Sequence, residues 1–263
     1  MIKTFFGLSR NPFAIDEDSP LMEHQQRHFD ILKVHTQQGG FCLILGEPGT
    51  GKTVLKNAIT RHGPTRMIPL VINRIPHTWS NLVRLLCQGL QLETAGTEAQ
   101  CATRLTTEVR KLNAMGKVVI LIIDDAQALP VDLIDKLCHL LYEFPKNHCL
   151  LLIGQPALGT TLRLHKHKDL EGRVSYTANL DILAPDALAN HIQRQLELAG
   201  LPRHTFTGDA LALILRFSNG AVGAVNNLCL GSLIEAVCDS TRTVGIQQVN
   251  AALMQPHRCH NEM

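Results

Sequence analysis

The sequence contains no apolar run long enough to span a bilayer and no recognisable secretory leader. Its longest apolar stretch, Val118–Ile123, falls far short of the ~20 residues that a membrane-spanning helix needs. Residues 1–7 give way at once to Arg10, Asn11 and Pro12, whereas a signal peptide would continue into an apolar core. These absences predict a cytoplasmic protein without a membrane partner.

Cysteine pairs at metal-ligand spacing and a strong charge imbalance are also missing. The 8 cysteines include no Cys-x-x-Cys pair, and several lie inside apolar runs, which predicts reduced, mostly buried thiols. The formal net charge is only +2, so composition permits a nucleic-acid partner without indicating one. With 263 residues, 45% of them hydrophobic, the chain can bury a substantial core.

What the sequence does contain is a glycine-rich loop between an apolar run and a helix-like segment. The loop reads Gly-Glu-Pro-Gly-Thr-Gly-Lys-Thr at residues 46–53, after Phe41–Leu45 and before Val54–Ile59. In that context the turn and the helix N-terminus aim backbone N–H groups at a single point, where a phosphate group binds. The pattern therefore predicts a phosphate-binding loop.

Two side chains of this loop have expected roles. Lys52 is expected to reach the β- and γ-phosphates of ATP, and Thr53 to offer its hydroxyl to Mg²⁺. Lys56 lies one helical turn further on, and its replacement is expected to cost little ATP affinity. The predicted nucleotide-binding residues are Gly46, Glu47, Pro48, Gly49, Thr50, Gly51, Lys52, Thr53 and Val54.

The acidic pair Asp124-Asp125 is the second chemical anchor. It closes the run Val118–Ile123, whose lack of alternation suits a strand covered on both faces of a parallel sheet. In phosphate-loop ATPases an aspartate at the end of a central strand holds the Mg²⁺ shell, and the next acidic residue polarises the attacking water. We expect Asp124 and Asp125 in these two roles. Strand ends are often acidic, so the pair is a weak signal alone and a strong one only downstream of a phosphate-binding loop.

Gln155 is a third candidate. It follows the strand-like run Cys149–Ile153 at the edge of the sheet where nucleotide is expected. Its side chain is a candidate contact for the γ-phosphate or the attacking water, although turn formation explains Gly154-Gln155-Pro156 equally well.

Hydrophobic periodicity divides the chain into an α/β part and a helical part. Strands are expected at residues 41–45, 67–72, 118–123, 149–153 and 174–178, and Pro69 makes the second of them an edge strand. Helices are expected at residues 22–37, 80–92, 98–115, 131–142, 186–199, 208–218, 221–238 and 246–254. No strand pattern interrupts the last four helices, which places a domain boundary near residue 183. The predicted domains are residues 1–183, with an N-terminal linker and helix at 1–40, and a small helical domain at 184–263.

Five motifs together make the chain similar to the ExeA/GspA-type AAA+ ATPases, relatives of the transposition regulators of the MuB, TniB and TnsC kind. They are the phosphate loop, Phe6–Phe13, Ile122–Gln127, Ile153–Leu158 and Ser218–Cys229. The resemblance implies an α/β AAA+ P-loop NTPase with a five-stranded parallel sheet sandwiched by helices and a small C-terminal helical lid. It also implies ATP and Mg²⁺ as ligands, homo-oligomers in which a neighbour completes each site, and Arg173 as the arginine finger.

The chain departs from that family at two places. Asp125 stands where the family usually has glutamate, so the water-activating carboxylate is one methylene shorter and hydrolysis is expected to be slow. In the lid, the family pattern Gly-Gly-Ile-Pro-Arg becomes Asn219–Gly223, which removes the arginine expected to sense the γ-phosphate. Both changes favour ATP as an assembly switch rather than a fuel.

The leading functional hypothesis is a DNA-transposition accessory ATPase that oligomerises on target DNA and recruits or stimulates a transposase. Secretion-associated members continue into a membrane segment and a further domain, whereas this sequence stops at Met263, which favours a free-standing ATPase. The alternative is an ExeA/GspA-like ATPase of a secretion or envelope-assembly system that acts on protein partners. A third hypothesis is a general nucleic-acid-remodelling motor.

The transposition hypothesis also predicts a ring or helical filament around double-stranded DNA without marked sequence preference. A head-to-tail interface repeats around an axis and yields a filament where its rotation does not close. A few inward-facing cations per subunit then suffice to hold the phosphate backbone, although each such residue is individually more typical of solvated surface. The candidates are Arg74, His77, Arg104, Arg110 and Lys111.

Overall fold

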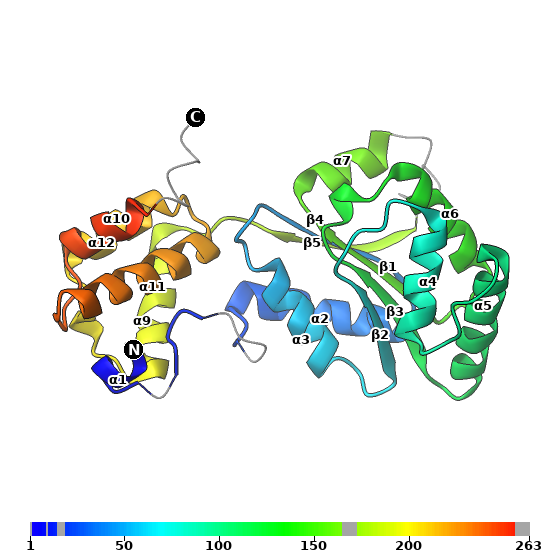
Figure 1. Cartoon of the computed structure of the whole chain (residues 1–263), viewed down its shortest axis with the longest axis horizontal. Helices are drawn as coiled ribbons and strands as arrows, with labels where there is room; N and C mark the ends of the chain where they lie inside the picture. The colour runs from blue at the N-terminus through cyan, green and yellow to red at the C-terminus, as the bar shows by residue number, and fades with distance from the viewer. Residues whose placement is uncertain (1, 9, 15–18, 165–172, 256–263) are drawn as a thin grey trace. The chain divides into compact units, whose positions relative to one another are not determined.

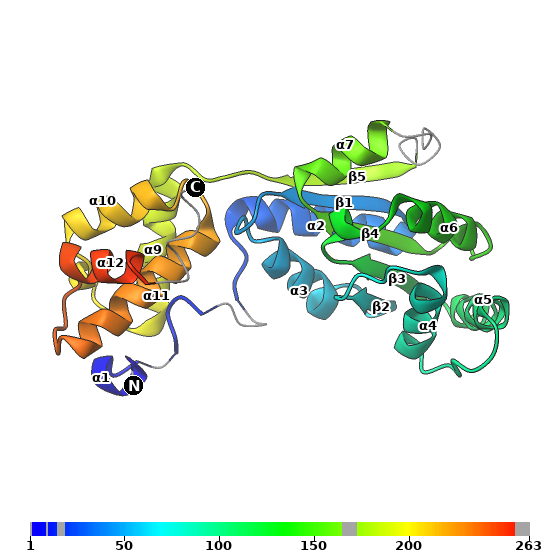
Figure 2. The ribbon, with the colours of Figure 1, turned by 45° about the horizontal axis from the view of Figure 1, so that its top comes forward.

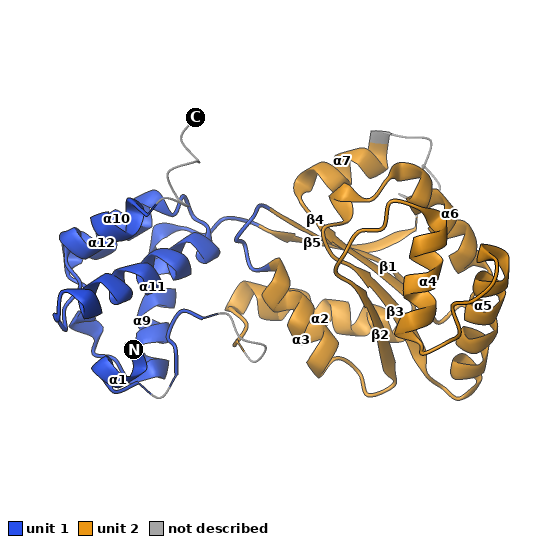
Figure 3. Ribbon diagram, viewed as in Figure 1, with its two compact units in different colours: residues 1–16, 47–51, 181–263 blue, residues 17–46, 52–180 orange. Residues whose placement is uncertain are grey.

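The computed structural model describes residues 2–8, 10–14, 19–164 and 173–255 of the chain (Figure 1). These residues form two compact units, each with its own packing (Figure 3). Unit 1 comprises residues 1–16, 47–51 and 181–263, and unit 2 comprises residues 17–46 and 52–180. The sequence-based division at residue 183 did not anticipate that residues 1–16 and 47–51 group with the C-terminal helices.

Unit 2 is built on a five-stranded, wholly parallel sheet, as predicted. The strands run in the order β2-β3-β4-β1-β5. Their bounds are β1 Gly40–Gly46, β2 Met67–Ile72, β3 Val118–Ile123, β4 Cys149–Gly154 and β5 Val174–Leu180. Strand β2, which carries Pro69, lies at an edge of the sheet, and this confirms the prediction from its missing backbone donor.

Helices cover both faces of the sheet (Figure 2). Side chains alternate along each strand, so Leu43 and Leu45 pack on one face, whereas Cys42 and Ile44 pack on the other. Every residue of β3 and β4 is buried, which explains their unbroken apolar sequences. The first face carries α4 Trp79–Gly89, α5 Glu98–Ala114, α6 Val131–Tyr142 and α7 Pro156–Leu164, and the second carries α2 Glu23–Gln38 and α3 Lys52–His62.

The register of the sheet places the candidate residues at one edge. Leu45 pairs with Gly154, Ile123 with Leu152, and Ile72 with Ile123. The carboxyl ends of β1, β2, β3 and β4 therefore fall together, and open α/β sheets bind ligands at this edge.

Unit 1 consists mainly of the C-terminal helices. Its elements are α1 Ile2–Phe6, α9 Pro185–Ala199, the 3₁₀ turn η2 Arg203–Thr205, α10 Gly208–Phe217, α11 Val222–Cys238 and α12 Ile246–Leu253. The aromatic opening segment packs here: Phe13 is buried, and its ring meets that of Phe206 edge-on at 6.2 Å between centroids. The sequence indicated that this segment packs against something else but gave no sign of α1.

Helix α7 is the other element that the sequence did not predict. Turn formation is one of the two explanations that the sequence allows for Gly154-Gln155-Pro156. In the structure, Pro156 is the first residue of a helix, where its fixed φ and missing N–H are tolerated.

The cysteines follow the prediction within the described residues. Cys42, Cys87, Cys101, Cys149 and Cys229 are buried free thiols, and Cys238 is exposed. Burial raises the pKa of Cys138 to about 12, which keeps that thiol protonated. No helix among the described residues is long and apolar enough to cross a membrane.

Candidate nucleotide-binding site

The glycine-rich loop has the backbone shape that the motif requires. Gly49 and Gly51 have φ values of +81° and +93°, a region that side chains with a Cβ rarely adopt. The Thr50 hydroxyl donates a hydrogen bond to the carbonyl oxygen of Glu47 at 2.8 Å and ties the turn together. Lys52 begins α3, and its ammonium donates to the carbonyl oxygen of Gly46 at 2.8 Å. A cation thus lies against the loop at the N-terminus of a helix, where phosphate is favoured.

The other predicted loop residues lie beside this turn. Glu47 and Pro48 are exposed, Thr53 is the exposed second residue of α3, and Val54 is half-buried. Phosphate oxygens suit backbone N–H groups and an ammonium, and Mg²⁺ suits a hydroxyl with a nearby carboxylate. Within unit 2, Lys52 and Thr53 at the start of α3, together with Asp124 at the end of β3, therefore supply groups that fit Mg²⁺-ATP.

Asp124 is already held by a cation of the chain. The ammonium of Lys56 donates to Asp124 Oδ2 at 2.6 Å and to Asn73 Oδ1 at 3.1 Å. The other oxygen, Asp124 Oδ1, accepts the backbone N–H of Asp125 at 3.1 Å. The side chains of Lys56 and Asp124 are only 12% and 17% exposed. Lys56 thus contacts the predicted metal ligand directly. The expectation that its replacement costs little ATP affinity stays a prediction.

Asp125 adopts a backbone conformation that favours its residue type. Its φ and ψ are 52° and 37°, in the left-handed region, which aspartate and asparagine tolerate better than other non-glycine residues. The conformation offers a physical reason for aspartate at a position where the resemblance leads us to expect glutamate.

Gln127 connects Asp125 to the end of β4, a role that the sequence analysis missed. Its Nε2 donates to Asp125 Oδ1 at 3.2 Å, and its Oε1 accepts the backbone N–H of Gln155 at 3.1 Å. A Cβ at Gly154 would lie 2.6 Å from Gln127 Oε1, so this glycine makes room for the bridge. Gln127 stood in the quoted motif Ile122–Gln127, but only the fold brings it to β4. The predicted role of the Gln155 side chain stays a prediction.

Arg173 lies at the amino-terminal ends of the strands, opposite the carboxyl ends that carry the other candidate residues. It directly precedes β5, and its guanidinium lies over the ring of Tyr142, 3.9 Å from the centroid. A strand as long as β5 separates its two ends by about 20 Å, so Arg173 does not reach Lys52 of its own chain. This placement is compatible with a finger supplied to a neighbouring subunit.

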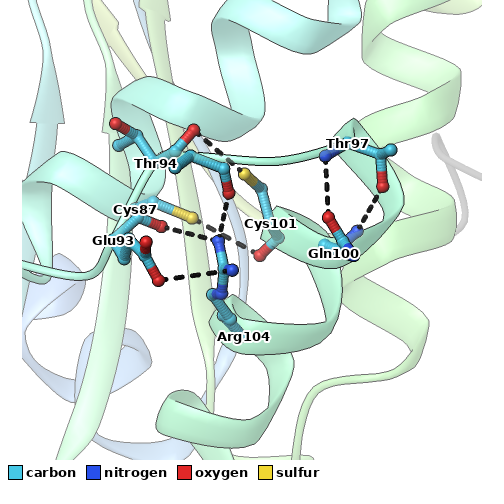
Figure 4. A network of polar contacts seen from close by, with 8 residues as sticks. Cys87, Glu93, Thr94, Thr97, Gln100, Cys101 and Arg104 are labelled. Atoms are coloured by element: carbon cyan, nitrogen blue, oxygen red, sulfur yellow. Dashed lines mark hydrogen bonds and ion pairs between the residues drawn. The ribbon is translucent and has the colours of Figure 1, made fainter.

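The predicted DNA contacts divide into two groups. Arg104 belongs to a polar network in which it bonds the carbonyl oxygens of Glu93 and Ala95 and pairs with the Glu93 carboxylate (Figure 4). Arg110 donates to the carbonyl oxygen of Glu143, and Lys111 pairs with Glu108 on the same helix. These three cations have intramolecular partners.

Arg74 and His77 form the second group. Both are exposed in the loop that follows β2, at the carboxyl edge of the sheet. The role of all five residues as DNA contacts stays a prediction.

Comparison with known proteins supports the architecture. Residues 34–162 match the family model described as an AAA domain. General secretion pathway protein A from Aeromonas hydrophila is 29% identical over 247 residues, which covers 90% of this chain but only 45% of that protein. The chain thus spans less than half the length of this curated relative.

Solved structures of low sequence identity share the fold. Cdc6p from Pyrobaculum aerophilum superposes with a TM-score of 0.76 at 15% identity, over 93% of this chain and 70% of that one. The Aeropyrum pernix ORC1 protein, solved in complex with DNA, gives 0.70 at 15% identity, over 93% and 69%. The Thermotoga maritima RuvB Holliday junction branch migration motor gives 0.59 at 16% identity, over 89% and 68%. The chain therefore shares its α/β fold with these structures, and residues 34–162 are similar to the AAA domain family.

Proposed function

We propose that the protein is an ATPase whose bound nucleotide controls its assembly into homo-oligomers. The observation that carries the proposal lies within unit 2. Lys52 begins α3 beside the end of β1, and Asp124, Asp125 and Gln127 follow β3, so all four lie at the carboxyl ends of the strands of one sheet. Lys52 and the loop amides would hold the phosphates of ATP, and Thr53 and Asp124 would hold Mg²⁺, which would neutralise the charge that develops on the phosphates.

The residues of this chain have distinct tasks in such a reaction. The Asp125 carboxylate would accept the proton of the attacking water, and the Gln127 amide fixes its Oδ1 in place. Arg173 lies too far from its own loop, so we propose that it completes the site of a neighbour. Hydrolysis would then depend on assembly, because a neighbouring subunit supplies the arginine finger in trans.

We further propose double-stranded DNA as the surface of assembly and DNA transposition as the process, with a transposase as the protein partner. Support comes from the motif resemblance and from Arg74 and His77, which are exposed in the loop after β2. Contact with the phosphate backbone of DNA predicts DNA binding that weakens steeply with salt and differs little between unrelated duplexes.

A second candidate function rests on the curated relative. General secretion pathway protein A from Aeromonas hydrophila is 29% identical over 90% of this chain, and this similarity favours a secretion-type ATPase that acts on protein partners. The third hypothesis, a nucleic-acid-remodelling motor, predicts translocation or unwinding driven by hydrolysis rather than assembly alone.

Duplex binding with and without a non-hydrolysable ATP analogue separates these functions. The DNA proposal predicts ATP-dependent, salt-sensitive complexes that electron microscopy resolves as rings or filaments around the duplex. Replacement of Arg74 and His77 by alanine should weaken these complexes while nucleotide binding persists. If only unbound protein is found at low salt with the analogue present, the secretion-type function is favoured instead.

A further inference from the structure

Lys56 contacts Asp124, the residue that would hold Mg²⁺. Lys56 belongs to α3, and Asp124 directly follows β3. The ammonium lies between two acceptors, Asp124 Oδ2 at 2.6 Å and Asn73 Oδ1 at 3.1 Å. Asn73 directly follows β2, so adjacent strand ends fix the position of this cation.

We propose that Lys56 is an internal cation that competes with Mg²⁺ for Asp124 and so sets the Mg²⁺ dependence of nucleotide binding. The inference rests on the proposed function, because it presumes that the loop binds ATP. A carboxylate whose charge is matched by an ammonium at 2.6 Å attracts a second cation more weakly than a bare carboxylate does. Both side chains are largely shielded from water, so solvent screens this competition less than at an exposed pair.

Lys56 has the opposite effect when Mg²⁺ is scarce. An unpaired Asp124 carboxylate would repel the polyphosphate of ATP, and the Lys56 ammonium offsets that repulsion. Removal of the Lys56 charge should therefore tighten Mg²⁺ binding and, in the same variant, weaken ATP binding without Mg²⁺. A brace that merely joins α3 to β3 would affect stability and leave both binding constants unchanged.

The test measures binding rather than turnover. A fluorescent non-hydrolysable ATP analogue is bound to the full chain, and Mg²⁺ is titrated into the complex. In Lys56→Met the half-saturating Mg²⁺ concentration should fall about tenfold, and the ratio of analogue Kd in EDTA to Kd in Mg²⁺ should rise. Lys56→Arg keeps the charge and should remain near the wild type. Lys136→Met, which removes an exposed lysine of α6, is the matched control and should change neither quantity.

Circular dichroism establishes that each variant folds. If Lys56→Met does not fold, Lys56→Gln, which keeps an amide donor for Asp124 and Asn73 while removing the charge, decides the matter. An unchanged or higher Mg²⁺ requirement in a folded, uncharged variant overturns the inference and leaves the ATPase proposal intact. If the wild-type chain does not bind the analogue at all, the proposed function itself fails.

Discussion

Replacement of Asp125 by asparagine isolates the base that we assign to hydrolysis. Asp125 has φ 52° and ψ 37°, and asparagine is the substitution that best keeps this left-handed backbone. Asparagine also retains an Oδ1 that can accept the hydrogen bond from Gln127 Nε2, which spans 3.2 Å in the wild type. The change therefore removes the proton acceptor while leaving the backbone and the bridge to β4 in place. Alanine is a poorer choice, because it would add about 1 kcal/mol of backbone strain and lose the bridge.

The expected loss of turnover follows from the role of the group. A positioned general base contributes about 10²- to 10⁴-fold, so the kcat of Asp125→Asn should fall by at least about 10²-fold. Because Asp124 and the loop are untouched, the Kd of an ATP analogue in Mg²⁺ should stay within about twofold. The assay is steady-state phosphate release beside analogue titration, with Asp132→Asn, an exposed carboxylate of α6, as the control. An unchanged kcat would refute the assignment of Asp125 as the water-activating group.

Three further predictions test other parts of the site. Lys52→Ala should lose most ATP affinity by equilibrium titration because it removes the ammonium at the loop, whereas Lys136→Ala should not; equal losses would contradict the phosphate-loop assignment. The monomeric Arg173→Ala variant should bind the ATP analogue normally, but the assembled variant should lose its ATPase activity. Normal ATPase activity of the assembled variant would show that Arg173 is only a surface arginine. Burial lowers the pKa of His191 below its ordinary value of 6.5, so the unfolded chain binds more protons and stability should fall as the pH drops below 6.5. His191→Gln should flatten the decline of Tm between pH 7 and 5, and an identical slope would show that the decline has another origin.

Much of the fold could be predicted from the sequence, because its strands and helices follow from the pattern of apolar residues over short stretches. Unbroken apolar runs identify β3 and β4 since both faces of a central parallel strand are buried, and Pro69 marks β2 as an edge strand. The composition of α1 and α7 gave no such signal. A helix of five residues has no apolar period to detect, and Pro156 is typical of turns as well as of a first helical position.

The sequence predicted only those site residues whose position is set by their own stretch of the chain. The loop and Asp124 were predicted because a strand end or a helix start alone places them. The roles of Lys56 and Gln127 depend on partners from other strands, and sheet order rather than sequence spacing decides these meetings. The partners of Arg104, a predicted DNA contact, were not readable for the same reason, since the carbonyl oxygens that it binds belong to the segment before α5.

The resemblance leads us to expect an arginine in the lid, and this chain has Asn219–Gly223 in its place. Gly223 donates its backbone N–H to the carbonyl oxygen of Gly49 at 2.8 Å, and both residues belong to unit 1. A Cβ at Gly223 would lie 2.9 Å from the Cα of Gly49, closer than real contacts of that kind, so any larger side chain forces the backbone to move. Gly223 thus contacts the loop through its main chain, whereas the resemblance leads us to expect an arginine side chain here. We expect the charge on the γ-phosphate to be met by Lys52 and by the Arg173 of a neighbour. On this hypothesis, hydrolysis should depend on assembly more strongly than in a relative that keeps the lid arginine.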